Sequence, residues 1–220
     1  MIEMNFETAR HNMIEQQIRP WNVIDPVVLD ALEAIPRENY VSEDLKESAF
    51  SDVELPIDCN QVMLSPKIEA KILQAVQVQK TDNVLEIGTG SSYMTALLAH
   101  LADKVCSVEI HSELSQKAEQ KFSDEGIDNV TFVVDDAANG FPHNGPYDVI
   151  ILTGSVAQLP ESFKQSLKPG GRLFAVIGQT PIMEATLITR VSATQFSYEG
   201  LFETLIPELE NVTRLNSFVL

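Results

Sequence analysis

A glycine-rich turn with acidic neighbours is the part of the sequence best suited to binding chemistry. The turn EIGTGSSY occupies residues 86–93, and Glu109 follows Gly90 by nineteen residues. Glycines between a strand and a helix let the backbone turn tightly and let a ligand approach, while the helix N-terminal amides point outward. An acid at the end of the next strand can accept both hydroxyl protons of a ribose. The pattern predicts a nucleoside site, with a plain strand-to-helix turn as the alternative.

The residues of the turn also indicate which nucleotide it binds. A dinucleotide fingerprint needs a third glycine where Tyr93 stands, and a phosphate-binding loop needs Gly-Lys-Ser or Gly-Lys-Thr, which the sequence lacks. S-adenosyl-L-methionine carries an adenosine without a phosphate, and its ammonium and sulfonium suit an acid at Glu86. We therefore predict S-adenosyl-L-methionine as the cofactor.

Acidic residues after the third predicted strand would complete this site. Asp135, Asp136 and Ala137 follow the run NVTFVV, at the edge of the sheet that would face the adenine. Asp136 can accept a proton from the adenine amino group, and a solvated acidic loop is the alternative. The expected cofactor-binding residues are Glu86, Gly88, Thr89, Gly90, Ser91, Glu109, Ile110, Asp136 and Ala137.

The histidines and cysteines do not follow a metal-binding pattern. None of the four histidines has a paired ligand spacing with another histidine or with a cysteine. Cys59 and Cys106 are the only cysteines and form no CxxC motif, which favours two free thiols in a reducing compartment. We expect no metal site.

Short apolar runs alternate with helical segments from residue 82 onward. The runs NVLEIG, KVCSVEI, NVTFVV, YDVIILTG and RLFAVIG predict strands, with EATLITRVSA and RLNSFVL as late additions. Strands that alternate with helices at this spacing are parallel and joined by right-handed crossovers. The sequence therefore predicts an α/β fold with a Rossmann-like, doubly wound, mostly parallel seven-stranded sheet.

The first eighty residues follow a different pattern and predict an N-terminal helical extension. Apolar residues recur at helical spacing from Phe6 to Ile18, and Pro20 ends that helix. Asp25 and Pro26 then suit the first positions of a second helix. We expect residues 1–80 to form a helical and irregular cap packed on an S-adenosylmethionine-binding core of residues 81–220.

The charge of the chain makes nucleic acid an unlikely partner. It has 220 residues, with 32 acidic against 15 basic ones, a formal net charge of −17. A phosphate backbone is repelled by such a field unless a basic patch outweighs it, and the sequence contains none. The N-terminus lacks an apolar stretch of signal-peptide length, and no apolar run is long enough to cross a bilayer. We expect a cytoplasmic protein without a membrane partner, as a monomer or small homo-oligomer.

The motifs together resemble a known family. VLEIGTGSSYMTALLA, the acid at Glu109, the DDA after the third strand, PYDVIILTG and LKPGGRL look like a class I S-adenosylmethionine-dependent methyltransferase. The upstream pieces IPRENYV, AFSDVELPI and NQVMLSP are similar to the protein-L-isoaspartate O-methyltransferase family. The resemblance implies methyl transfer to the α-carboxylate of L-isoaspartyl residues in damaged proteins. An ionised carboxylate needs no general base, so such an enzyme works by positioning its substrates.

The chain departs from the family where the acceptor would bind. The family stretch reads Gly-Gln-Thr-Ile-Ser-Ala-Pro, and its serine is assigned the active-site role; here Leu64 stands at that position and Ser65 follows it. Asp58 and Asn60 replace two family glycines in the preceding loop. In an extended stretch, successive side chains point to opposite sides. These changes suggest an altered substrate groove and an isoaspartyl activity that is weak or lost.

Ser65 has three interpretations. It precedes Pro66 at the start of a predicted helix, which favours an N-cap. It is alternatively a catalytic residue that replaces the missing hydroxyl, or it has no defined role. Two other functions also stay open for the whole chain: a protein of this fold that binds S-adenosylmethionine without turnover, and a methyltransferase with another acceptor.

Overall fold

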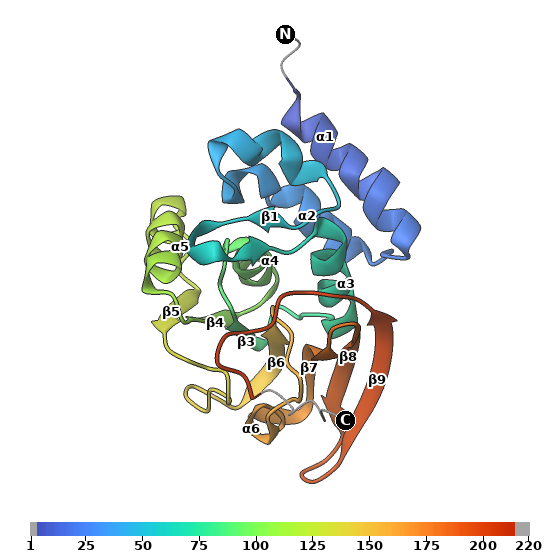
Figure 1. Cartoon of the computed structure of the whole chain (residues 1–220), viewed down its shortest axis with the longest axis vertical. Helices are drawn as coiled ribbons and strands as arrows, with labels where there is room; N and C mark the ends of the chain where they lie inside the picture. The colour runs from blue at the N-terminus through green and yellow to red at the C-terminus, as the bar shows by residue number, and fades with distance from the viewer. Residues whose placement is uncertain (1–3, 214–220) are drawn as a thin grey trace, which may run out of the picture.

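The computed structural model describes residues 4–213, and a seven-stranded sheet lies at its centre (Figure 1). The strands are β3 (Asn83–Ile87), β4 (Lys104–Glu109), β5 (Val130–Val134), β6 (Tyr147–Leu152), β7 (Leu167–Gln179), β8 (Ile182–Arg190) and β9 (Phe196–Glu203). Their order is β5-β4-β3-β6-β7-β8-β9. Strands β3 to β7 are parallel to one another, whereas β8 pairs antiparallel with β7 and β9. The predicted α/β fold with a mostly parallel seven-stranded sheet is confirmed.

The helices that cover this sheet begin and end at the expected signals. They are α2 (Pro26–Ala34), α3 (Pro66–Val76), α4 (Tyr93–Leu101), α5 (Ser112–Glu125) and α6 (Glu161–Gln165). The Asp25 side chain accepts a hydrogen bond from the backbone N–H of Val27 at 2.9 Å, with Pro26 at the first helical position. Gly126 ends α5 in the left-handed conformation that glycine adopts without strain.

Side chains that alternate along the strands place apolar residues on both faces of the sheet. In β3, Val84 joins one buried cluster, while Leu85 and Ile87 join the other. The first cluster includes residues of α2, α3 and α4, and the second includes Phe163 of α6. Burial on both faces holds the strand ends in fixed positions, and the candidate site lies there.

The N-terminal part packs on one face of the sheet without a separate core (Figure 1). Its other elements are α1 (Phe6–Met13), the π-helical η1 (Ile14–Ile18), the 3₁₀ segments η2 (Arg19–Trp21), η3 (Arg37–Tyr40), η4 (Glu43–Phe50) and η5 (Asp58–Asn60), and the paired short strands β1 (Leu55–Pro56) and β2 (Val62–Met63). Apolar residues of this part share the first cluster with sheet residues such as Phe174 and Val176. Leu64 and Ser65 connect β2 to the start of α3.

The C-terminal third differs from expectation in two places. The strand predicted at RLFAVIG is longer than expected, because β7 begins at Leu167 and includes the KPGG segment. Its pairing with β6 shifts register between Tyr147 and Val149. Strand β9 was not expected, because its sequence FSYEGLFE contains a glycine and mostly exposed polar residues, as suits an edge strand. The predicted strand RLNSFVL lies outside the described residues. Among residues 4–213, no helix is both long and apolar enough to cross a membrane.

Candidate cofactor and acceptor site

A cleft opens at the carboxyl ends of the central strands. Its walls come from the ends of β3 and β4, from residues 135–138 after β5, and from Thr153 and Gly154 after β6. Residues 61, 62 and 64 and residues 207–210 close it from the other side. The strand order reverses direction between β3 and β6, and ligands of open α/β sheets bind at such a switch point.

The glycine turn contributes bare backbone to this cleft. Gly88 and Gly90 both line it, with φ values of 95° and 52°. A Cβ atom at Gly88 would collide with Oγ1 of Thr153. That hydroxyl donates to the carbonyls of Ile87 and Gly88, at 2.9 Å and 2.8 Å. Only glycine fits at residue 88, because the hydroxyl of Thr153 occupies the place of a side chain. The turn therefore presents bare backbone to the cleft.

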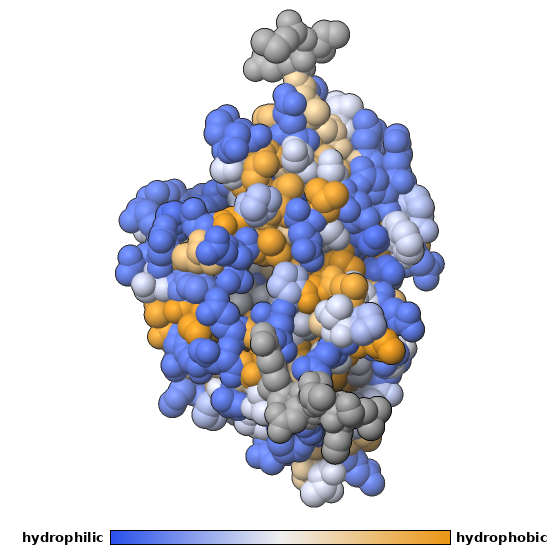
Figure 2. Space-filling view, viewed as in Figure 1, coloured by the Kyte–Doolittle hydropathy of each residue, from blue (hydrophilic) through white to orange (hydrophobic). Residues whose placement is uncertain are grey.

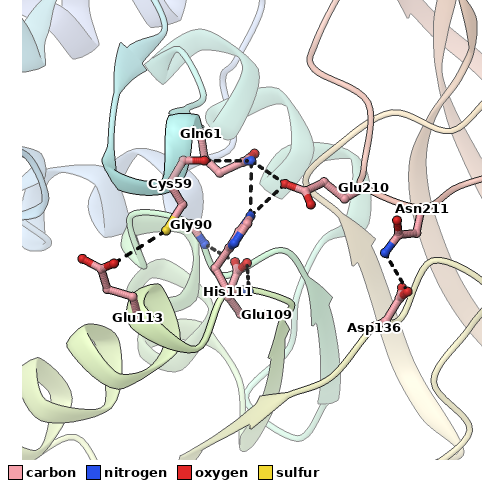
Figure 3. A network of polar contacts seen from close by, with 9 residues as sticks. All are labelled: Cys59, Gln61, Gly90, Glu109, His111, Glu113, Asp136, Glu210 and Asn211. Atoms are coloured by element: carbon pink, nitrogen blue, oxygen red, sulfur yellow. Dashed lines mark hydrogen bonds and ion pairs between the residues drawn. The ribbon is translucent and has the colours of Figure 1, made fainter.

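Glu109 lies at the end of β4 and links the turn to the next loop (Figure 3). One carboxylate oxygen accepts from the backbone N–H of Gly90 and the other from that of His111, each at 3.0 Å. The side chain lines the cleft although the residue is 5% exposed. Each oxygen keeps a free lone pair, so the carboxylate can accept from two adjacent hydroxyls of a ligand while the two amides hold it still.

Glu86 has different surroundings from those expected of a residue that contacts the cofactor. It is fully buried, and one carboxyl oxygen accepts from the hydroxyls of Thr95 and Ser107, each at 2.6 Å. The other oxygen has no hydrogen-bond partner among the described residues. Thr89 lies beside the same group, with its hydroxyl 2.6 Å from that of Ser107. Glu86 and Thr89 support the turn from beneath, and neither lines the cleft.

The Glu86→Gln variant should gain stability relative to the wild type as the pH rises. Burial raises the pKa of Glu86 from 4.5 to about 8, against the opposing hydrogen bonds from Ser107 and Thr95. At a pH between 4.5 and about 8, the folded state keeps a proton on Glu86 that the unfolded state releases. The wild type therefore loses stability as the pH rises through this range. Between pH 5 and pH 7 we expect the variant to gain about 1 to 2 kcal/mol in free energy of unfolding.

Urea unfolding at several pH values measures this difference. Glu119→Gln, on the exposed face of α5, serves as the control and should show no such trend. A Glu86→Gln difference that is the same at pH 5 and pH 7 would mean that the buried carboxyl is already ionised at the lower pH.

Residues 207–211 cross the front of the site, and we call them the strap. Asp136 connects the cleft to this strap. One Asp136 oxygen accepts from the backbone N–H of Ala138 at 3.0 Å, and the other accepts from the side-chain amide of Asn211 at 2.9 Å. Gly88, Gly90, Glu109, Ile110, Asp136 and Ala137 all line the cleft, whereas Ser91 lines a separate depression beside α5. The structure thus gathers most of the predicted cofactor residues around one cavity.

The strap is also attached beside Glu109 (Figure 3). One oxygen of Glu210 accepts from the side-chain amide of Gln61 at 2.9 Å and lies 2.8 Å from Nε2 of His111. The sequence does not indicate this contact, because Gln61 and Glu210 are far apart in the chain and no motif includes both. Together with the Asn211 contact, they hold the strap over the cleft.

Leu64 and Ser65 lie on opposite sides of the chain. Leu64 lines the cleft, whereas Ser65 lines a neighbouring groove. Ser65 occupies the N-cap position of α3, but its hydroxyl makes no capping hydrogen bond, so that part of the capping interpretation is wrong. The side chain that faces the cleft from this stretch therefore consists of methyl groups, and the nearby hydroxyl faces away.

Arg37 supports this wall from behind. It is fully buried in η3, and its guanidinium donates to the carbonyl of Leu64 at 2.6 Å and to that of Ala49 at 2.9 Å. It also donates to the carboxylate of Glu69 in α3 and lies 5.1 Å from the ring centroid of Tyr93. One side chain thus fixes the backbone at Leu64 relative to α3 and to the start of α4.

Known proteins resemble this chain over most of its length. A family model described as protein-L-isoaspartate(D-aspartate) O-methyltransferase matches residues 8–205. The chain is 37% identical over 198 residues to the protein-L-isoaspartate O-methyltransferase of Brucella anthropi, a match that covers 90% of this chain and 91% of the relative. It is 34% identical over 211 residues to that of a Jannaschia species, covering 95% of each.

Solved structures show the same arrangement. A protein-L-isoaspartate O-methyltransferase superposes with a TM-score of 0.78 and 27% identity, covering 90% of this chain and 65% of that longer one. A Plasmodium falciparum structure, described as a putative enzyme of this name in complex with S-adenosyl-L-homocysteine, superposes with a TM-score of 0.77. At 18% identity, this second likeness supports the fold alone.

Proposed function

The chain belongs to the protein-L-isoaspartate(D-aspartate) O-methyltransferase family of S-adenosylmethionine-dependent enzymes, and we propose that its acceptor is the α-carboxylate of L-isoaspartyl residues in damaged proteins. The observation that carries this proposal is the family match over residues 8–205, combined with a cleft that presents the glycine turn, Glu109 and Leu64 to one cavity.

The residues of the cleft fit S-adenosylmethionine. Gly88 and Gly90 line the cleft without side chains, so the ligand can approach the backbone closely. Two backbone amides hold the Glu109 carboxylate, whose remaining lone pairs would accept from the ribose hydroxyls. Asp136 would accept from the adenine amino group. Glu86 and Thr89 would act from beneath the turn, and Ser91 from its far side. When bound, the cofactor supplies a methyl group activated by its sulfonium.

The remaining task of the protein is to position the acceptor and exclude water. A carboxylate with a pKa near ~4 is ionised at neutral pH, so no residue needs to remove a proton from it. The strap and residues 61–64 enclose the cleft from the side away from the sheet, which restricts the approach of the acceptor and of water. Catalysis then depends on holding the carboxylate oxygen in line with the methyl group.

The wall that would orient the acceptor carries no hydroxyl in this chain. Leu64 offers methyl groups to a charged oxygen, and its carbonyl is occupied by Arg37. We expect slow turnover for this reason. The same observation supports a second candidate function, a protein that binds S-adenosylmethionine and a damaged peptide without transferring the methyl group.

One experiment separates these functions. The protein is incubated with methyl-labelled S-adenosylmethionine and two peptides of identical sequence, one with an L-isoaspartyl and one with an L-aspartyl residue. The proposal expects labelled, base-labile methyl ester on the isoaspartyl peptide alone. Cofactor binding in calorimetry without any ester favours the second function, and ester on both peptides would contradict an isoaspartyl acceptor.

The Glu109→Gln variant should bind S-adenosylmethionine about tenfold more weakly, because it replaces one charged acceptor of the ribose hydroxyls by an amide group that cannot accept. Calorimetric titration measures the Kd. Glu113→Gln, an exposed change on α5, is the control and should leave the Kd unchanged. Equal affinities for the wild type and Glu109→Gln would remove Glu109 from the cofactor site.

The remaining expectations concern partners and location. The net charge of −17 argues against binding DNA or RNA, since association would lack the counterion release that drives it. We also propose a cytoplasmic protein that acts as a monomer or small homo-oligomer, with residues 1–80 as a cap on the core.

A further inference from the structure

A second groove lies beside the cleft, on the other side of residues 64 and 65. It runs between η2, α3 and the end of β9, and its volume is about 300 Å³. Its lining includes Trp21, Ser65, Lys67, Lys71, Phe202 and Leu205. We call it the lysine groove. Figure 2 shows this face of the molecule, where apolar side chains gather between hydrophilic ones over α3 and the adjoining end of β9.

The lysine groove and the cleft share two walls. Leu64 lines the cleft and Ser65 lines the groove; likewise Pro207 lines the cleft and Leu205 lines the groove. These two chain segments therefore lie between the cavities. A peptide whose carboxylate is held against Leu64 reaches the lysine groove by continuing over them.

Ser65 provides a polar contact in this groove. The residue is 9% exposed, and its hydroxyl has no hydrogen-bond partner among the described residues. The hydroxyl is not one of the buried side-chain atoms that lack a partner, so water reaches it in the groove. A peptide backbone offers both a donor and an acceptor that can replace this water.

Lys71 provides a charge without a carboxylate partner. Its ammonium lies 4.2 Å from the ring centroid of Phe202 and 5.1 Å from that of Trp21. Within the described residues, no carboxylate lies at ion-pair distance from it. Its neighbour Lys67 is instead paired with Asp52 at 2.6 Å. Among these residues, Lys71 thus has no ion pair of its own, because Asp52, the carboxylate whose charge acts on it, is already paired with Lys67.

The other charges of the groove do not cancel this one. Glu54 and Glu203 also line the groove, but among the described residues neither forms an ion pair with Lys71. Burial raises the pKa of Glu54. Burial, followed by the charge of Lys67, lowers the pKa of Lys71, so a carboxylate placed beside the ammonium would relieve its desolvation. The groove is suited to an acidic side chain between two aromatic rings.

We propose that the lysine groove holds the part of the acceptor peptide next to the isoaspartyl residue, and that Lys71 selects peptides with an acidic side chain there. This inference rests on the proposed function for the identity of the ligand. It makes Lys71 and Ser65 specificity residues of the reaction, outside the cleft that holds the cofactor.

The test measures peptide binding apart from turnover. Isoaspartyl peptides with Glu or Gln at each of the two positions on either side of the isoaspartyl residue are titrated into the full-length protein with S-adenosylhomocysteine present. At one or more of these positions the wild type should bind the Glu peptide about fivefold more tightly, as expected for a partly exposed ion pair. Lys71→Met should remove this preference, and Lys71→Arg should keep it.

Two further variants serve as controls. Lys104→Met makes the same charge change at the first residue of β4, at the other end of that strand from Glu109. It should leave the preference intact. Ser65→Ala should weaken both members of each peptide pair equally, by a few-fold, with an unchanged melting temperature. Equal affinity for Glu and Gln peptides in the wild type, or a preference that survives Lys71→Met, would overturn the role of Lys71. Peptide binding with the predicted preference but without methyl ester would support the groove while contradicting turnover.

Discussion

Leu64→Ser should raise kcat/KM on an isoaspartyl peptide by up to about one hundred-fold. The side chain of Leu64 lines the cleft, so a serine there would place a hydroxyl donor where the wild type offers only methyl groups. A hydrogen bond to a charged oxygen contributes about 1.5 to 3 kcal/mol, which corresponds to a rate factor of about ten to over one hundred. The measurement is the rate of ester formation under subsaturating peptide.

Leu64→Ala separates the hydroxyl from the space that the smaller side chain opens. It should leave kcat/KM within a few-fold of the wild type, because it adds no donor. A similar rise in Leu64→Ser and Leu64→Ala would mean that Leu64 blocks access rather than lacking a hydrogen bond. Fast wild-type turnover that neither change affects would leave backbone amides as the groups that orient the acceptor.

Arg37→Met should lower the free energy of unfolding by about 3 to 5 kcal/mol, the range for removing one partner of a buried ion pair. Arg37 is fully buried and Glu69 is 2% exposed, so the change leaves a buried carboxylate without its charge partner. It also removes the donors to the carbonyls of Leu64 and Ala49. Urea unfolding at neutral pH measures the loss.

The double variant Arg37→Met/Glu69→Met is the matched control. Replacing both charges by apolar groups should recover much of the lost stability, since the unpaired carboxylate is then gone. If the double variant is as unstable as Arg37→Met, the two carbonyl hydrogen bonds would be the dominant contribution. Burial raises the pKa of Glu69 to about 7 even with Arg37 beside it, so a loss below about 1 kcal/mol in Arg37→Met would show that Glu69 takes up a proton or is reached by water.

The sheet was predictable because each of its first strands is a short apolar run between turn signals. NVLEIG and YDVIILTG are buried on both faces, and such runs identify parallel strands without knowledge of their neighbours. Strand β9 lacks that signal, since its sequence is polar and interrupted by Gly200. It forms a strand by pairing with β8, which is a tertiary effect.

The candidate site was predictable where function depends on backbone geometry. The turn around Gly88 and the acid at Glu109 have a fixed spacing because a strand, a turn and a helix separate them. The direction of the Glu86 carboxyl was not predictable, because Thr95 and Ser107 attract it from two other elements. Contacts such as Gln61 with Glu210 join segments that have no common sequence pattern.

The shared apolar cluster also determines when this chain can fold during synthesis. Ile18 and Leu32 belong to the same cluster as Phe174 and Val176 of β7, so the segment that leaves the ribosome first packs against a strand that is made much later. Until β7 emerges, the sheet that covers the apolar face of the N-terminal helices is incomplete. Domains with such non-local contacts fold slowly and expose apolar surface until they do. The nascent chain therefore exposes part of this cluster over most of its translation, and the cleft forms only near the end of it.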